Sequence, residues 1–443
     1  MTNTLKYNPI GTAFYLRFGY VAEDFPLIYP VNSDNLNWNR VNQPTLWQDV
    51  QTMGKGLRIF SQTTSIASPV SEIDRLIRQE LIKVFNQTKP VCFLSGGIDS
   101  PLIAAIAQSM SNEKLKAFTF STEDVATDET AAASAYAQAF DMEHHLVRLD
   151  ESQLTETILE LSKTSALPLG DYSVIPTYLV CKAAAEYSDT ILSGDGGDEL
   201  FWGYASRMAR VINLSHLFRF PKWFRKLRWW TLHRPYEWNP RYFDTVGEWY
   251  QSVHEHNFES WLKGLFPGLP PLPSTYQQYD FDGAEPDKTA FWVRWNEFSG
   301  HMKAGIDKVV SASEAAGIEV ASPLLSQPVI DLASQLDWRI CLDPDNVIGK
   351  LPLRQLLAKY CSFQTDQKKG FGSPMRQWLS GPLRELFEET VLNRTSLGGL
   401  EIDRPKMRSL FEDQLKGTTD RSWGLWIFLS LALWEDQQAK ELG

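Results

Sequence analysis

Between residues 91 and 205, short apolar runs alternate with longer segments whose apolar residues recur at helical spacing. The apolar runs are VCFL (91–94), KAFTFS (116–121), EHHLVRL (143–149) and TILS (190–193), and the helical segments are 101–110, 128–140, 152–164 and 174–186. Helices of about a dozen residues are the usual crossovers between neighbouring parallel strands. The alternation therefore predicts an α/β fold with a doubly wound parallel sheet.

The segments on either side of this region have other patterns. Residues 71–88 predict an amphipathic helix, and residues 291–443 are mostly helical in pattern. Within the latter, the apolar run 423–435 is too short to cross a bilayer, so it predicts a buried helix. Near the amino terminus, residues 14–21 and 56–60 predict strands, which gives a small N-terminal β portion.

Composition restricts the class of protein. The 443 residues include 43% hydrophobic residues, which favours more than one core. A net charge of −11 disfavours sequence-independent binding to nucleic acid. The cysteines have no metal-like spacing, which indicates a reduced, cytoplasmic protein; they are Cys92, Cys181, Cys341 and Cys361. The first residues carry no secretory leader, and we expect no contact with a membrane.

We expect two domains, residues 1–70 and residues 71–443. The larger one comprises the alternating core 90–205, an aromatic and basic insertion 206–290, and a helical part 291–443. In the insertion, residues 216–244 could bind nucleic acid by stacking and charge. Because the whole chain is acidic, we favour a docking surface for a partner protein in this region.

The run FLSGGIDSP predicts a phosphate-binding turn between a strand and a helix. Gly96 and Gly97 allow a tight turn with converging backbone amides, and Ser95 adds a hydroxyl donor. Ser100 followed by Pro101 is a good start for a helix, whose amino end attracts anions.

An acid in the same turn changes the expected ligand. Asp99 would repel a bare phosphate, so we expect a divalent cation between the two. No lysine follows the glycines, which excludes the P-loop. A second turn, SGDGGDELFWGY (193–204), also combines Ser-Gly, further glycines and acids, and it follows the apolar run 190–193. In a parallel sheet both turns would lie at the ligand-binding edge.

These motifs resemble a known family. FLSGGIDS is similar to the pyrophosphate-binding loop of the ATP pyrophosphatase (PP-loop) superfamily, and SGDGGDELFWGY is similar to the second hallmark of the asparagine synthetase family within it. Further similar blocks follow in the same order: GDYSVIPTYLV (170–180), IDKVVSASEAAGIEVASPLL (306–325), GKLPLRQLL (349–357) and QKKGFGSPMRQWL (367–379). The resemblance covers residues 71–435 and implies an adenine nucleotide α-hydrolase-like fold.

The resemblance also implies a reaction and its ligands. Family members activate a carboxylate with ATP and Mg²⁺ as an acyl-adenylate, release pyrophosphate, and pass the acyl group to an amine. The residues implied for nucleotide and pyrophosphate are Leu94, Ser95, Gly96, Gly97, Asp99, Ser100, Phe120 and Gly194. The acids implied for the metal are Asp99 and Asp198.

Four further residues match catalytic positions of the family. Lys368, or its neighbour Lys369, matches the lysine that stabilises the adenylation transition state. Asp195 and Glu319 match a pair that orients the acceptor amine and takes its proton. Other readings stay open for this pair, because Asp195 could stabilise its own turn. Glu319 could form a buried ion pair with Lys308 or Lys303.

The chain departs from the family pattern in two regions. The first cysteine is Cys92, so the amino-terminal nucleophile of glutamine hydrolysis is missing, and residues 1–70 resemble a degenerate, inactive glutaminase remnant. Lys308, Ala321 and Ser326 stand where the family commonly has arginine, arginine and aspartate. A lysine cannot copy the bidentate grip of a guanidinium, so we doubt that free aspartate is the substrate.

Two enzyme hypotheses follow, and both form an amide at the expense of ATP. In the first, a specialised or peptide carboxylate is joined to an amine, as in the lasso-peptide cyclases and β-lactam synthetases that resemble this family. In the second, ammonia, free or from a separate glutaminase, yields asparagine or a related carboxamide. A nucleotide-binding scaffold without activity is a third hypothesis. A tRNA-modifying ATP pyrophosphatase is disfavoured, because its cysteine pairs are absent.

Overall fold

The computed structural model describes residues 5–22, 25–29, 68–122, 128–228, 239–272, 285–364 and 373–442. Within these residues, five strands form one parallel sheet: β1 (Val91–Phe93), β2 (Lys116–Ser121), β3 (Glu143–Arg148), β4 (Thr190–Leu192) and β5 (Glu319–Ala321). Their order is β3-β2-β1-β4-β5. The chain thus moves outward from β1 to β3 and then returns to β4 on the other side of β1. This reversal is the point at which open α/β sheets bind ligands.

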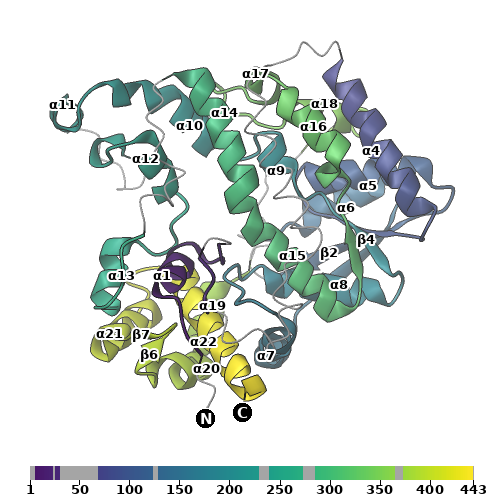
Figure 1. The fold of residues 1–443 in the computed structure, drawn as a ribbon. Helices are drawn as coiled ribbons and strands as arrows, with labels where there is room; N and C mark the ends of the chain where they lie inside the picture. The colour runs from purple at the N-terminus through teal and green to yellow at the C-terminus, as the bar shows by residue number, and fades with distance from the viewer. Residues whose placement is uncertain are drawn as a thin grey trace.

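Helices cover both faces of the sheet (Figure 1). On one face lie α4 (Pro69–Phe85), α5 (Asp99–Met110) and α6 (Thr130–Ala139); on the other lie α8 (Val174–Ala185) and α15 (Met302–Ala316). Alternation along β1 explains the two layers, because Cys92 packs with the first group and Phe93 with the second. The predicted α/β architecture is confirmed.

The remaining helices build the rest of the molecule around this core (Figure 1). They are α7 (Leu154–Thr164), α9 (Gly197–Leu200), α10 (Ala205–Leu214), α11 (Lys222–Arg228), α12 (Val246–Ser252), α13 (Glu259–Leu265), α14 (Pro286–Asn296), α16 (Gln327–Gln335), α17 (Trp338–Cys341), α18 (Leu351–Leu357), α19 (Met375–Ser380), α20 (Arg384–Phe387), α21 (Arg404–Leu415) and α22 (Ser422–Leu442). A π-helix, Glu297–His301, joins α14 to α15. A short hairpin pairs β6 (Ser396–Leu397) with β7 (Leu400–Glu401).

The strand predicted over residues 14–21 is wrong, because α1 (Pro9–Phe18) occupies most of it. The side-chain oxygen of Asn8 accepts a hydrogen bond from the amide of Ile10 at 3.2 Å, and Gly19 ends the helix with φ +74°. Consecutive residues such as Phe14 and Tyr15 are both fully buried, which a half-exposed strand could not achieve. The N-terminal β portion is therefore reduced to isolated bridges within the described residues, and the strand predicted over 56–60 lies outside them.

The buried helix predicted near the carboxyl end is confirmed as α22. Its residues 425–434 are buried, and Tyr15 of α1 donates a hydrogen bond to Ser430 Oγ at 3.1 Å. No helix in the described part of the chain is long and apolar enough to cross a membrane. The four cysteines are free thiols, and all of them are buried.

Candidate active site

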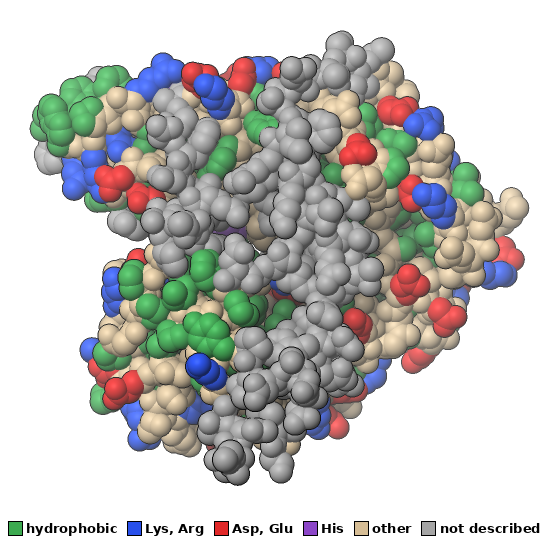
Figure 2. Space-filling view, in the orientation of Figure 1, with side chains coloured by type: hydrophobic (Ala, Val, Ile, Leu, Met, Phe, Trp, Pro, Cys, Tyr) green, Lys and Arg blue, Asp and Glu red, His purple; other side chains and the backbone are tan. Residues whose placement is uncertain are grey.

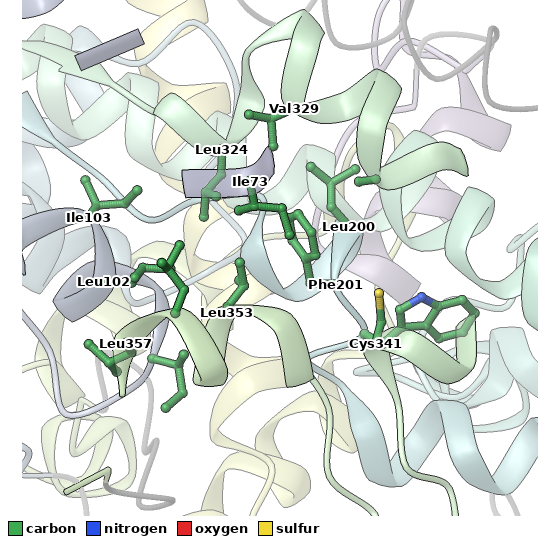
Figure 3. Packing of buried hydrophobic residues seen from close by; sticks show 14 of the residues in the cluster. Ile73, Leu102, Ile103, Leu200, Phe201, Leu324, Val329, Cys341, Leu353 and Leu357 are labelled. Carbon is green, nitrogen blue, oxygen red and sulfur yellow. The ribbon is translucent and has the colours of Figure 1, made fainter. Parts of the chain in front are cut away.

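Two turns leave the carboxyl ends of adjacent strands and meet at the reversal of the sheet. The first turn, residues 95–100, follows β1, and the second, residues 193–198, follows β4. Both line one cavity of about 400 Å³. The helices α5 and α9, which begin in these turns, pack their side chains with those of α16 and α18 in the main hydrophobic core (Figure 3).

Hydroxyl groups organise the first turn at the amino end of α5. Ser100 Oγ accepts a hydrogen bond from the amide of Ser95 at 3.0 Å and lies 2.8 Å from Ser95 Oγ. Ser95 Oγ in turn accepts from the amide of Gly97 at 3.2 Å. The amide of Gly96 instead donates to a carboxylate oxygen of Glu129 at 3.0 Å. The turn therefore presents two hydroxyls beside the positive end of a helix, which suits an anion.

Glycines allow the two turns to touch. A Cβ atom on Gly194 would lie 2.5 Å from the amide nitrogen of Ser100, and one on Gly197 would lie 2.4 Å from Cγ of Asp99. Real Cβ atoms essentially never come this close to other heavy atoms. The second turn can therefore approach the first only because these positions lack side chains.

The structure brings Asp99 and Asp198 together. Both carboxylates contact the ammonium group of Lys350, whose Nζ lies 2.7 Å from Asp198 Oδ1 and bridges to Asp99 Oδ2. All three side chains are nearly buried, with 5% of Lys350 and 11% of each acid exposed. The acids thus share a cation position at the floor of the cavity, although their role toward a metal stays a prediction.

Seven of the residues implied by the resemblance line the cavity, and they are Ser95, Gly97, Asp99, Ser100, Gly194, Asp195 and Asp198. Leu94 and Phe120 are buried in the two hydrophobic layers of the sheet. Their contact with a nucleotide stays a prediction, as does that of Gly96. Lys368 and Lys369 lie outside the described residues.

The structure separates Glu319 from Asp195. Glu319 begins β5 and pairs with Thr190, so it lies at the amino end of a parallel sheet, and the cavity lies at the carboxyl end. Its side chain is exposed. The predicted catalytic pair is therefore wrong. The buried ion pair considered for Glu319 is also wrong, because Lys303 bonds Asp307 at 2.6 Å and Lys308 faces Asp171.

Asp195 remains at the cavity and stabilises its own turn. Its Oδ2 accepts a hydrogen bond from Ser193 Oγ at 2.6 Å, and its amide donates back to the same hydroxyl at 3.3 Å. The turn-stabilising contact is thus present, and the carboxylate also lines the cavity. Both readings of Asp195 stay open.

The far end of the cavity carries a second pair of opposite charges. Asp171 Oδ1 accepts hydrogen bonds from the amide and the hydroxyl of Ser173, at 2.9 and 2.7 Å. Asp171 Oδ2 faces Nζ of Lys308 at 3.8 Å, which is longer than a hydrogen bond. Tyr172 and Trp423 form an aromatic wall beside them, with ring centroids 4.7 Å apart. This end could bind a polar substrate.

A buried polar network leads away from the cavity. Glu297 bonds Arg207 at 3.1 Å and accepts a hydrogen bond from Tyr250. His254 stacks on His301 with ring centroids 3.3 Å apart, and burial holds the pKa of both imidazoles well below the usual value. Two positive charges at this distance would repel strongly, so the stack disfavours protonation of both rings at once. His301 also lines the cavity.

One more acid lies beside the metal-binding candidates. Glu199 is buried, and it accepts a hydrogen bond from the hydroxyl of Tyr204 at 2.8 Å. Burial, followed by the charge of Asp198, raises the pKa of Glu199 to about 7. The floor of the cavity therefore holds less negative charge than three ionised carboxylates would carry.

Comparison with known proteins identifies the family. The asparagine synthase family model matches residues 75–436. The chain belongs to the asparagine synthase family. It is 24% identical to asparagine synthetase [glutamine-hydrolyzing] 1 of Bacillus subtilis (strain 168), over 82% of this chain and 60% of that protein. It is 26% identical to a putative asparagine synthetase [glutamine-hydrolyzing] of Mycobacterium tuberculosis (strain ATCC 25618 / H37Rv), over 77% of this chain and 53% of that protein. The chain thus spans little more than half the length of these relatives.

Sequence reasoning missed several residues of this family member's cavity. Asp171, which lines the cavity, and Lys350, which contacts Asp99 and Asp198, each lie in a block that resembles the family, but the blocks alone assign them no role. His301 and Trp423 carried no usable signal, because a lone histidine and a tryptophan in an apolar run are more often packing residues. Their position at the cavity depends on tertiary packing of α15 and α22.

Proposed function

We propose that this member of the asparagine synthase family is an ATP-dependent carbon–nitrogen ligase. It activates a carboxylate as an acyl-adenylate, releases pyrophosphate, and couples the acyl group to an amine. The observation that carries the proposal is the meeting of Asp99 and Asp198 on one cation position, at the reversal of the sheet. Such a position, beside the amino end of α5, suits a triphosphate and its metal.

The residues present fit ATP and Mg²⁺. Carboxylate oxygens are the ligands that Mg²⁺ prefers, and Asp99 and Asp198 would supply them. The hydroxyls of Ser95 and Ser100 and the amide of Gly97 hydrogen-bond one another in this structure, and they would exchange these bonds for bonds to the pyrophosphate. Gly194 packs directly against the start of α5, which keeps the two turns close enough to act on one ligand. A bound Mg²⁺ would neutralise phosphate charge.

The chemistry divides into two displacements. In the first, a carboxylate oxygen attacks the α-phosphorus, and the bond from that phosphorus to the β-bridging oxygen breaks as pyrophosphate leaves. In the second, the amine nitrogen attacks the acyl carbon, AMP leaves, and the nitrogen gives up a proton. We propose Lys368 or Lys369 as the charge that stabilises the first step, and Asp195 as a group that orients the amine.

Lys308 is our candidate for holding the substrate carboxylate at the far end of the cavity. Its side chain is only 16% exposed, and its ammonium group faces Asp171 at 3.8 Å, so it can turn toward an incoming anion. A lysine binds a carboxylate through a single ammonium group, whereas a guanidinium would form a bidentate pair of hydrogen bonds with it. We therefore propose that the substrate is not free aspartate and that the enzyme acts in specialised or peptide (macrolactam) biosynthesis. We also propose that the chain has no glutaminase activity of its own.

The second candidate is amidation with ammonia, as in an asparagine synthase. The relatives reported above are named as glutamine-hydrolysing asparagine synthetases, which favours this reading. The two candidates share the adenylation step and differ in the nucleophile. A nucleotide-binding scaffold without activity is the outcome if that step is absent.

A partner protein could dock on the aromatic and basic insertion. Phe220, Trp223 and Leu227 lie at helical spacing around α11 and are 43%, 68% and 72% exposed. Figure 2 shows hydrophobic side chains with lysines and arginines near them at the upper left, over α11. Residues 229–238 of the insertion lie outside the described part. We propose docking of a protein here rather than of nucleic acid or a membrane.

Pyrophosphate release tests the proposed function. The purified chain would be incubated with Mg²⁺ and ATP, a panel of free and peptide carboxylates, and ammonia, hydroxylamine or a primary amine. We expect AMP and pyrophosphate to form with at least one carboxylate, and the preferred amine then separates the two candidates. Tight ATP binding without pyrophosphate release for any carboxylate would leave the scaffold as the better account.

A further inference from the structure

Lys350 occupies the position that joins the two acid-bearing turns. Its Nζ lies 2.7 Å from Asp198 Oδ1 and also contacts Asp99 Oδ2, and the residue is 4% exposed. Lys350 precedes α18, whereas Asp99 begins α5 and Asp198 lies in α9. Three separate parts of the chain thus converge on one buried ammonium group.

The backbone of Lys350 is held in an uncommon conformation. Its φ is +58° and its ψ +30°, a left-handed region that side chains rarely adopt. Such a conformation is unfavourable and persists only where its surroundings fix it. The amide of Lys350 donates to the carbonyl of Phe201 at 2.8 Å, which fixes the residue beside the second turn. The fold therefore directs this side chain at the acids.

The charges of Asp99, Asp198 and Lys350 determine which further ions can bind at this position. Taken by themselves, the ionised carboxylates of Asp99 and Asp198 carry a charge of −2, and the ammonium group of Lys350 reduces this to −1. Uncompensated buried charge is strongly unfavourable, so Lys350 supplies a counter-ion without any metal. A free divalent cation would have to displace this ammonium or bind beside it. A triphosphate would bring its own negative charge and could accept the displaced ammonium.

We propose that Lys350 keeps free divalent metal out of the acid pair, so that the pair accepts metal only together with a nucleoside triphosphate. The inference rests on the proposed function for the identity of the nucleotide complex. Lys350 is thus a specificity-determining residue, because it distinguishes metal–nucleotide from metal alone. Without nucleotide, the ammonium group of Lys350 occupies the position between the two acids, and free metal does not bind there.

Metal binding without nucleotide is the direct test. The full chain would be titrated with Mn²⁺ alone, and free Mn²⁺ would be followed by electron paramagnetic resonance. We expect Lys350→Met to bind one Mn²⁺ about 100-fold more tightly than the unmodified chain, a coupling of usual size. The double variant Lys350→Met, Asp198→Asn should lose this gain. Lys359→Met, at an exposed lysine just after α18, should behave as the unmodified chain.

Thermal unfolding provides a second readout that needs no activity. Lys350→Met should lower the melting temperature, and Mn²⁺ should raise it in this variant but not in the unmodified chain. If Lys350→Met does not fold, Lys350→Gln takes its place. Tight binding of Mn²⁺ alone by the unmodified chain would overturn the proposal, and so would a folded Lys350 variant with no gain in metal affinity.

The metal-alone titrations separate this inference from the proposed function. A parallel titration of the unmodified chain would use Mn²⁺ with a non-hydrolysable ATP analogue. Failure of that complex to bind would count against the proposed ligase. The difference between the unmodified chain and its Lys350 variants with Mn²⁺ alone would still decide the role of Lys350.

Discussion

At the residue scale, the account depends on charges that meet at the floor of the cavity. We expect Asp198→Asn to reduce carboxylate-dependent ATP–pyrophosphate exchange at least about 100-fold, because it removes one of the two charges that would hold the metal. Thermal unfolding would check that the variant folds. Glu113→Gln, at an exposed acid far from these turns, is the matched control. Exchange at the normal rate in folded Asp198→Asn would remove the metal role of Asp198.

Close packing between the turns makes a second prediction at this scale. In Gly194→Ala the new methyl group would lie 2.5 Å from the backbone of Ser100, so the turns must move apart. We expect a loss of about 1–3 kcal/mol in unfolding free energy, as for other overpacked sites, together with loss of pyrophosphate exchange. Gly264→Ala in α13 meets no atom within 4 Å, and it should be neutral or stabilising. Equal stability of the two variants in urea unfolding would contradict the geometry.

A buried histidine predicts a pH dependence of stability. His256 stacks on Trp423 at 4.2 Å, and burial lowers its pKa to about 4. In the unfolded chain the pKa returns to about 6.5, so the unfolded state takes up a proton first as the pH falls. The stability from this residue is complete above about pH 6.5 and is lost progressively toward pH 4.

Urea unfolding at pH 7 and pH 5 would measure this loss. Because the raised pKa of buried acids such as Asp307 changes stability in the opposite direction, the informative quantity is the difference between the unmodified chain and His256→Asn. We expect the variant to lose less stability between the two pH values. An identical pH dependence would show that His256 does not titrate as described.

At the scale of elements, most of the sheet and its helices could be predicted from the sequence. The strands β1 to β4 and the helices between them follow from apolar runs and helical spacing, which are local signals. The segment of α1 differs from the prediction because its run of apolar residues is also typical of a strand. The stronger local signals were Asn8 before a proline and Gly19 after the run, which mark the start and end of a helix.

Two other elements could not be predicted from local signals. β5 has three residues, and its direction in the sheet decides that Glu319 lies at the edge opposite the cavity. The π-helix Glu297–His301 depends on contacts made by Glu297 with distant residues such as Arg207. Motif resemblance gave the order of the blocks, but the placement of individual side chains depends on tertiary packing.

The helix α22 predicts an effect on stability. Trp426 is 2% exposed, and its Nε1 donates to the carbonyl of Leu169 at 2.7 Å. Trp426→Ala should cost about 3–5 kcal/mol in unfolding free energy, because it removes a large buried side chain and a buried hydrogen bond. Trp223→Ala in α11, at a tryptophan that is 68% exposed, should change little. Comparable losses in the two variants would contradict the burial of α22.

At the scale of the whole molecule, the N-terminal helix α1 and the C-terminal helix α22 lie together, although they are far apart in sequence (Figure 1). Because Trp423 of α22 lines the cavity, the described start of the chain packs against a helix that forms part of the cavity wall. The division into domains at residue 70, the cytoplasmic location and the docking of a partner stay predictions. The site itself could be predicted as far as its two turns, because each follows its own strand directly.

The central claim is that the two acid-bearing turns hold a metal–nucleotide complex so that a carboxylate is adenylylated. The most direct test uses an active carboxylate from the pyrophosphate-release screen, labelled with ¹⁸O, and mass spectrometry of the nucleotide product. The account predicts transfer of a carboxylate oxygen to AMP and no label in pyrophosphate. Formation of ADP, or of AMP without the label, would contradict it.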